Sequence, residues 1–286
     1  MRENISASCY VERQSFSYNR FLFDFERNFD IKLSFHWFVD NWQLSLYIVV
    51  IYLVVIFGGQ QIMKTRPPFR LRKLLFVWNL GLALFNILFV IRTVPAGIHR
   101  LQENGFYASL CQPGSAEHMQ AVGVWAYWFA IFKVVELGDT VFIVLRKKPL
   151  MVVHWYHHAS VLVYGWTICN YPSGMHPVFV LANAFVHAFM YSYLALKVLN
   201  VPIPKQTGMI VTILELIQLG FGVCLTIYSY FAIVWDEECC IFDQAILISV
   251  LLYLSYLLLF TNFFIRSYVS KKPLLEIMGV GKQKLQ

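Results

Sequence analysis

The sequence predicts an all-α, polytopic membrane protein with seven transmembrane helices. Of its 286 residues, 58% are hydrophobic and only 14% are charged, and the mean hydropathy is +0.58. Seven windows are long and apolar enough to cross a bilayer, which takes about 20 apolar residues in a helix. The charged residues fall mainly in short segments between these windows. Membrane topology therefore explains the net charge of +7 better than a nucleic-acid partner does.

The chain divides into three regions. Residues 1–42 form a polar, aromatic-rich N-terminal arm, residues 43–270 are expected to form the seven-helix transmembrane domain, and residues 271–286 form a basic tail. The expected spans are residues 44–63, 74–94, 122–145, 150–169, 178–199, 208–235 and 241–268.

Turn-forming and charged residues separate these apolar runs. Basic segments at residues 64–73 and 146–149 end the first and third spans, and a longer loop follows the second. A loop with proline and glycine at residues 172–177 separates the fourth span from the fifth, and an acidic loop at residues 236–238 separates the sixth from the seventh. Each span is therefore bounded by residues that lipid disfavours.

The distribution of positive charge predicts the orientation. Lysine and arginine are concentrated after the first, third and fifth spans and in the C-terminal tail. By the positive-inside rule these segments are cytosolic, so the N-terminus is lumenal and the C-terminus is cytosolic. The sequon at Asn4 is then a candidate glycosylation site in the lumen. Cys111, Cys239 and Cys240 fall on the same oxidising side, where one disulfide can form.

Three histidines, His154, His157 and His158, lie in the expected fourth span. In a helix, offsets of three and four residues place the imidazoles on one side, within an arc of about 100°. Polar clusters inside a membrane cost free energy, so this one indicates a working site. A single histidine would more often only line a helix contact, but three on one face favour function.

Charged residues recur every three positions in the expected third span. Lys133, Glu136 and Asp139 can share one side of a helix, where opposite charges can pair. We therefore expect them to face the interior of the bundle. Two interpretations stay open, namely an internal ion-pair network that fixes helix packing, and direct participation in catalysis.

Polar residues also follow one face of the expected fifth and sixth spans. Asn183, His187 and Tyr191 are spaced by four residues, so His187 is expected to be a fourth imidazole beside the other three. Glu215 and Gln218 in the sixth span are three residues apart, although Glu215 can also be solvated near the cytosolic end. We interpret these residues as supporting or substrate-binding groups.

Four imidazoles beside amide and charged groups suit two kinds of chemistry. Imidazole binds iron or zinc, but the other four of the chain's eight histidines lie on the N-terminal arm, in lumenal loops or at span ends, away from His154. The small number of histidines near the cluster argues against a di-iron desaturase, but a mononuclear metal site stays open. Imidazole is also a nucleophile toward thioesters. In that case Arg146, Lys147 and Lys148 suit the phosphates of coenzyme A, and we expect no metal or other cofactor.

Three motifs resemble those of the very-long-chain fatty acid elongases, the membrane 3-ketoacyl-CoA synthases of the endoplasmic reticulum. They occur here in the family's order and spacing, and the similarity of span pattern covers nearly the whole chain. The motifs are Lys133-x-x-Glu136-x-x-Asp139-Thr140, His154-x-x-His157-His158 and Asn183-x-x-x-His187-x-x-Met190-Tyr191-x-Tyr193.

This resemblance implies an architecture and a reaction. Six of the seven helices would enclose a tunnel that acyl-CoA enters from the cytosol. There a long-chain acyl-CoA would condense with malonyl-CoA to give 3-oxoacyl-CoA, carbon dioxide and CoA. His157 would carry the acyl group as an acyl-imidazole, while His158, His187 and Asn183 would orient groups and stabilise charge.

The resemblance also carries finer expectations. Trp155-Tyr156 in the histidine motif is similar to the subgroup that extends saturated and monounsaturated chains, and branched chains fit the same chemistry. Two departures, Leu194 and Glu215, replace the family's common Tyr and Gln, and they concern substrate choice more than reaction type.

Family alignment pairs Cys111 with Cys239 and leaves Cys240 over. The endoplasmic reticulum is the implied location, and Lys282-x-Lys284 resembles a retrieval signal. The ketoacyl reductase, dehydratase and enoyl reductase of the elongation cycle are the implied partners, besides membrane lipid and a second copy in a homodimer.

Two other functions compete with this interpretation. A metal-dependent lipid desaturase or hydroxylase would also use membrane histidines. A seven-helix lipid transporter or receptor would also place polar groups inside a bundle, but it leaves the three motifs unexplained.

Overall fold

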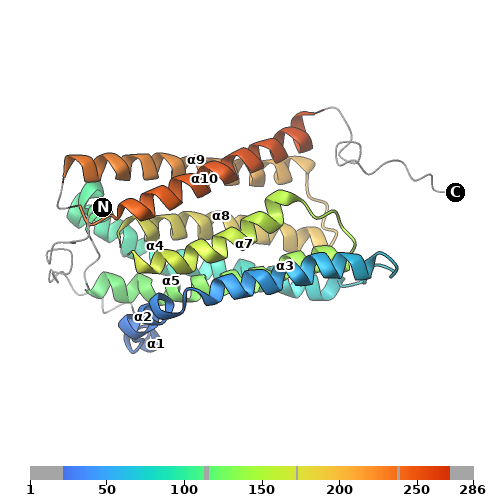
Figure 1. The fold of residues 1–286 in the computed structure, drawn as a ribbon, viewed down its shortest axis with the longest axis horizontal. Helices are drawn as coiled ribbons and strands as arrows, with labels where there is room; N and C mark the ends of the chain where they lie inside the picture. The colour runs from blue at the N-terminus through green and yellow to red at the C-terminus, as the bar shows by residue number, and fades with distance from the viewer. Residues whose placement is uncertain (1–21, 113–115, 172, 237–238, 271–286) are drawn as a thin grey trace.

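The computed structural model describes residues 22–112, 116–171, 173–236 and 239–270, where all regular structure is helical (Figure 1). A 3-10 turn follows α7 at Ile168–Asn170, and a π-helical turn follows α10 at Ile265–Val269. The α-helices are α1 (Asp24–Arg27), α2 (Ile31–Asn41), α3 (Leu44–Met63), α4 (Arg72–Cys111), α5 (Ala116–Glu136), α6 (Gly138–Leu145), α7 (Val152–Thr167), α8 (Met175–Val198), α9 (Lys205–Trp235) and α10 (Asp243–Phe264).

Five helices in the described part of the chain are long and apolar enough to cross a membrane, namely α3, α4, α8, α9 and α10. The chain is therefore a multi-pass membrane protein. The expected third span is divided between α5 and α6, and α7 has 16 residues, fewer than the roughly 20 of a typical crossing. The count of seven spans stays a prediction.

Helix α4 is longer than expected. The expected second span ends at residue 94, but the helix continues through Pro95 to Cys111, so most of the expected loop after it is helical. The backbone of α4 leaves helical geometry at Gly105, whose φ of +71° is readily adopted by glycine. Glycine therefore permits the change of direction within α4.

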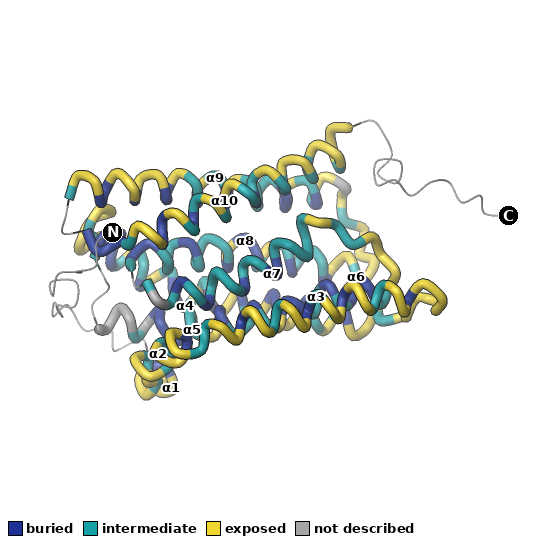
Figure 2. Tube along the Cα trace, in the orientation of Figure 1, coloured by how far each residue is buried: buried dark blue, intermediate teal, exposed yellow. Residues whose placement is uncertain are grey.

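Six helices pack in a closed ring in the order α4, α5, α7, α10, α9 and α8, with α8 returning to α4. Helix α3 lies beside this ring and packs against α6 and α7. The outer faces of α3, α9 and α10 are largely exposed, as Figure 2 shows, and they carry apolar residues such as Ile51, Ile217 and Leu258. Polar groups such as Lys133 and His187 are buried instead. This distribution is typical of a protein surrounded by lipid.

Side-chain hydroxyl groups join α7 to α10. Tyrosine and serine alternate as partners along the two helices, and each pair lies at hydrogen-bonding distance. In an apolar surrounding, such bonds satisfy hydroxyls that would otherwise be buried without a partner. They hold the histidine-bearing helix in place. The pairs are Tyr156 with Ser255 (3.1 Å), Ser160 with Tyr256 (2.8 Å) and Tyr164 with Ser249 (2.9 Å).

The described part of the N-terminal arm folds onto the bundle. Glu26 of α1 has a fully buried side chain that accepts two hydrogen bonds from Arg92 of α4, at 3.0 and 2.6 Å. Trp125 of α5 and the Phe23 backbone donate to the same carboxylate, each at 2.7 Å. This ion pair ties α1 to two helices of the ring. Spacing within one helix gives no sign of this pair, because its two residues lie 66 positions apart.

The Glu26 carboxylate is expected to make stability depend on pH. Burial raises its pKa, but the hydrogen bonds from Arg92, Phe23 and Trp125 outweigh burial and lower the pKa below its usual range. Because the folded pKa lies below the unfolded value of about 4.3, this stabilisation is present above that pH and lost as pH falls through the folded pKa. Breaking the buried pair with Glu26→Gln should cost about 3 kcal/mol at pH 7.

Thermal unfolding in detergent between pH 7 and pH 3 measures this effect. The difference in Tm between the wild type and Glu26→Gln should shrink as the pH falls. Asp24→Asn is the matched control, because the Asp24 side chain is 94% exposed and its loss should leave Tm unchanged. A Tm difference that is the same at every pH would contradict the assignment.

The disulfide between Cys111 and Cys239 is present and joins the end of α4 to the segment before α10. The expectation that Cys240 is left over is wrong, because Cys240 is also disulfide-bonded. Cys240 directly follows Cys239, and its backbone N–H donates to the Cys111 carbonyl. Cys239 and Cys240 therefore both belong to one cross-linked end of the bundle. Asn4 and the Lys282-x-Lys284 pair lie outside the described residues.

Candidate functional site

The three histidines of α7 lie together, as the helical spacing predicted. The ring centroids of His154 and His158 are 4.5 Å apart, and those of His157 and His158 are 5.5 Å apart. Helix α7 begins at Val152 after an extended residue, so the cluster occupies its first two turns. The neighbouring helices α5 and α10 bring further groups to these rings.

His157 differs from its two neighbours in its surroundings. Its ring packs against Tyr256 and Phe260 of α10, at centroid distances of 4.8 and 5.9 Å. Within the described residues, neither ring nitrogen of His157 forms a hydrogen bond, and neither is sealed off, whereas Nε2 of His154 and Nδ1 of His158 are both buried without a partner. Of the three imidazoles, His157 is therefore the one with two free and accessible nitrogens.

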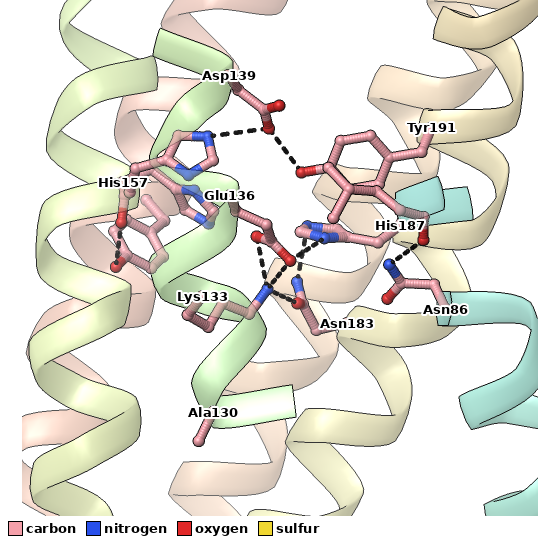
Figure 3. A network of polar contacts seen from close by, with 12 residues as sticks. Asn86, Ala130, Lys133, Glu136, Asp139, His157, Asn183, His187 and Tyr191 are labelled. Carbon is pink, nitrogen blue, oxygen red and sulfur yellow. Dashed lines mark hydrogen bonds and ion pairs between the residues drawn. The ribbon is translucent and has the colours of Figure 1, made fainter. Parts of the chain in front are cut away.

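A chain of polar contacts runs from α5 to α8 (Figure 3). Lys133 Nζ donates to both Glu136 carboxylate oxygens, at 3.0 and 2.9 Å, and to Asn183 Oδ1 at 3.0 Å. An ammonium group only donates, so the Asn183 oxygen faces Lys133 and its amide N–H is left to donate to His187 Nε2, 3.2 Å away. The remaining nitrogen of His187, Nδ1, then carries the proton and lies 3.7 Å from Glu136.

The expected ion-pair network therefore exists. Lys133 and Glu136 are 2% and 1% exposed, so their charges are removed from water and stabilise each other. Direct participation of these residues in catalysis stays a prediction. The contacts also join His187 to the network, as the spacing on α8 predicted. Its Nε2 accepts a hydrogen bond from Asn183, and its Nδ1 lies within ion-pair distance of Glu136.

A second group of contacts surrounds Asp139, at the start of α6. Tyr191 of α8 donates its hydroxyl to Oδ2 at 2.7 Å, and Trp78 of α4 donates its indole N–H to Oδ1 at 2.7 Å. His158 Nε2 lies 4.0 Å from Oδ2. Trp78 was not predicted from the sequence, because a tryptophan in an apolar run gives no sign of an inward hydrogen bond. The residue is nevertheless part of the site.

The two expected polar residues of α9 do not join these networks. Within the described residues, Glu215 and Gln218 form no hydrogen bond or ion pair, and both side chains are partly exposed. Glu215 is close enough to Tyr191 to act on its hydroxyl electrostatically. Roles for Glu215 and Gln218 in substrate binding stay predictions.

One residue of the basic segment after α6 contacts the backbone near the end of α3. Lys147 Nζ donates to the backbone carbonyls of Lys64 and Arg66, at 3.3 and 3.2 Å, just beyond α3. Lys147 and Lys148 are exposed, and Arg146 is half-buried. Binding of coenzyme A phosphates by this segment stays a prediction.

In the part of the chain that the structure covers, no group of three or more His, Cys, Asp or Glu side chains is arranged to hold a metal ion.

Comparisons with known proteins agree with the motifs. The GNS1/SUR4 (ELO) family matches residues 37–274. Very long chain fatty acid elongase 6 of Drosophila melanogaster is 39% identical over 252 residues, which are 87% of this chain and 80% of the relative. The human protein of the same name is 36% identical over 249 residues, with 87% and 93% covered. Human very long chain fatty acid elongase 3 is 37% identical over 256 residues, with 87% and 91% covered. The three motifs and these matches together show that the chain belongs to the GNS1/SUR4 (ELO) family, the family of the very-long-chain fatty acid elongases.

Proposed function

We propose that this protein condenses a long-chain acyl-CoA with malonyl-CoA to give 3-oxoacyl-CoA, carbon dioxide and CoA. As a member of the elongase family, it is an acyltransferase. The observation that carries the proposed reaction is His157, an imidazole with free ring nitrogens that lies among polar residues inside an apolar bundle. Such a group can attack a thioester while the bundle excludes water.

In the first half of the reaction, a His157 nitrogen attacks the thioester carbonyl of acyl-CoA. The carbon–sulfur bond breaks and a carbon–nitrogen bond forms, so the acyl group becomes an acyl-imidazole. The proton lost from the imidazole leaves with the sulfur as the CoA thiol. The tilted packing of the His157 ring against Tyr256 restricts its rotation, which favours attack from one orientation.

In the second half, malonyl-CoA loses carbon dioxide and leaves the enolate of acetyl-CoA. The enolate carbon attacks the acyl carbon, the carbon–nitrogen bond breaks, and His157 regains a proton from solvent. Decarboxylation supplies the carbanion, so no strong base is needed. The second N–H of the Asn183 amide is a candidate donor to the enolate oxygen. The three N–H groups of Lys133 are engaged by Glu136 and Asn183, so this ammonium would contribute its positive charge and not a hydrogen bond.

The proposal also covers the enclosure of the acyl chain, the preferred acyl chains and the membrane topology. The ring of α4, α5, α7, α10, α9 and α8 is the candidate enclosure for the acyl chain. The Trp155-Tyr156 pair favours saturated, monounsaturated or branched chains. We also propose seven spans in the endoplasmic reticulum membrane with the N-terminus lumenal, on the basis of the positive-inside rule.

The test is incubation of detergent-purified protein with radiolabelled malonyl-CoA and a panel of straight, branched and unsaturated acyl-CoAs. We expect a labelled 3-ketoacyl product two carbons longer than its substrate, with the highest yield from saturated and monounsaturated chains. Absence of product across the panel from well-folded protein would contradict the proposal. Stoichiometric iron in that protein would then favour lipid oxidation.

A further inference from the structure

The backbone is irregular where α5 meets α6. Leu137 N–H bonds to the Val134 carbonyl and Thr140 N–H to the Leu137 carbonyl, both at 3.2 Å, so these contacts span three residues instead of four. At the same place the Trp78 indole lies against Gly138. A Cβ atom on Gly138 would be 2.5 Å from Trp78 Cζ2 and 2.7 Å from Cη2. A side chain at position 138 would therefore displace the indole.

The close approach to Gly138 brings the indole nitrogen to Asp139. Trp78 Nε1 donates to Oδ1 and the Tyr191 hydroxyl donates to Oδ2, both at 2.7 Å. The indole also packs edge-to-face against Phe142, with centroids 5.4 Å apart. Two helices, α4 and α8, thus fix both oxygens of one carboxylate, which leaves the carboxyl group little freedom to rotate.

The fixed carboxylate faces a histidine of the proposed reaction. Asp139 Oδ2 lies 4.0 Å from His158 Nε2. His158 is 6% exposed, and its other nitrogen, Nδ1, has no hydrogen-bond partner within the described residues. A carboxylate beside one imidazole nitrogen favours the proton there. The lone pair of His158 is then on Nδ1, a buried nitrogen that has no hydrogen-bond partner among the described residues.

We propose that Trp78 is a positioning residue of this site, which fixes Asp139 so that it orients His158, and that Gly138 provides the space the indole needs. The inference rests on the proposed condensation, because it assigns a residue that supports the same histidines. Trp78 itself touches no reacting atom. Its effect reaches the reaction through Asp139, so its loss should slow the chemical step more than it weakens substrate binding.

The first experiment separates the N–H group from the ring, in the purified full-length protein. Trp78→Phe keeps an aromatic ring and removes the donor, whereas Trp78→His keeps a ring N–H. Trp166→Phe is the matched control, because its buried indole donates to a backbone carbonyl, that of Ala130, at 3.1 Å. We expect kcat for 3-ketoacyl formation to fall about 10- to 100-fold in Trp78→Phe with KM nearly unchanged. Trp78→His should lose less, and Trp166→Phe should keep kcat within about twofold.

The second experiment tests the role of Gly138. Gly138→Ala should lower both Tm and kcat, because the methyl group displaces the indole. Adding Trp78→Phe should restore Tm, since the smaller ring leaves room, while kcat stays low. Equal kcat values in Trp78→Phe and Trp166→Phe, or a raised KM with unchanged kcat, would overturn the inference alone. Absence of product from the wild type would instead contradict the proposed condensation, and the inference would fall with it.

Discussion

His157→Ala is expected to abolish formation of the covalent acyl-enzyme and to lower the condensation rate about a thousandfold or more, as loss of a nucleophile does in other enzymes. The physical reason is that, within the described residues, both ring nitrogens of His157 are accessible and have no hydrogen-bond partner. Neither neighbouring histidine has two accessible ring nitrogens, because His154 Nε2 and His158 Nδ1 are buried.

Intact-protein mass measurement after incubation with acyl-CoA alone tests this result. The wild type should gain the mass of one acyl group, and addition of malonyl-CoA should remove it as 3-ketoacyl product. His99→Ala is the control, because His99 is a partly exposed histidine of α4 that contacts Glu103, outside the polar cluster. Equal acylation of the wild type and His157→Ala would eliminate His157 as the nucleophile, and label that malonyl-CoA cannot remove would mark a side reaction.

Lys133→Met is expected to lower the free energy of unfolding by about 3–5 kcal/mol, the usual cost of leaving one charge of a buried pair without its partner. The Glu136 carboxylate would keep its burial but lose both hydrogen bonds from the ammonium group. Asn183 would also lose the donor that fixes its amide. Thermal unfolding in detergent should show this as a markedly lower Tm.

The double variant Lys133→Met with Glu136→Met separates the two interpretations of this network. Removing both charges should restore most of the lost Tm, because no unpaired charge remains. We expect condensation to stay impaired, since His187 loses the carboxylate beside Nδ1 and the fixed amide beside Nε2. Recovery of both stability and activity would assign the pair to packing alone. Equal Tm values for the single and double variants would contradict the ion-pair account.

Helical periodicity explains why much of the site could be predicted. Residues three or four apart on one helix share a face wherever that helix packs, so the clustering of His154 with His158 and the pairing of Lys133 with Glu136 followed from local spacing. The high cost of polar groups in lipid then predicted that these faces point inward. Spacing also grouped Glu215 with Gln218, but within the described residues neither side chain forms a hydrogen bond.

Contacts between helices could not be obtained this way. Trp78 and Asp139 are 61 residues apart, and Arg92 and Glu26 are 66 apart, and no periodicity relates such positions. The packing of the Trp78 indole against Gly138, beside the break at Leu137, also joins segments far apart in the sequence. Likewise, the basic run predicts phosphate binding by Lys147, and the run by itself gives no sign of the backbone carbonyls near the end of α3 that this lysine also contacts.

The sequence by itself determined the all-helical membrane class, the faces on which the histidines and charges lie, and the family motifs, because these depend on composition and on spacing within one helix. Only the tertiary structure decided which helices form the ring, which imidazole keeps both nitrogens free, and that Trp78 and Tyr191 hold Asp139. These features depend on how close two helices approach each other. That distance is determined by side-chain volumes and by hydrogen bonds between distant segments. At Gly138, for example, the absence of a side chain lets the Trp78 indole pack against the backbone.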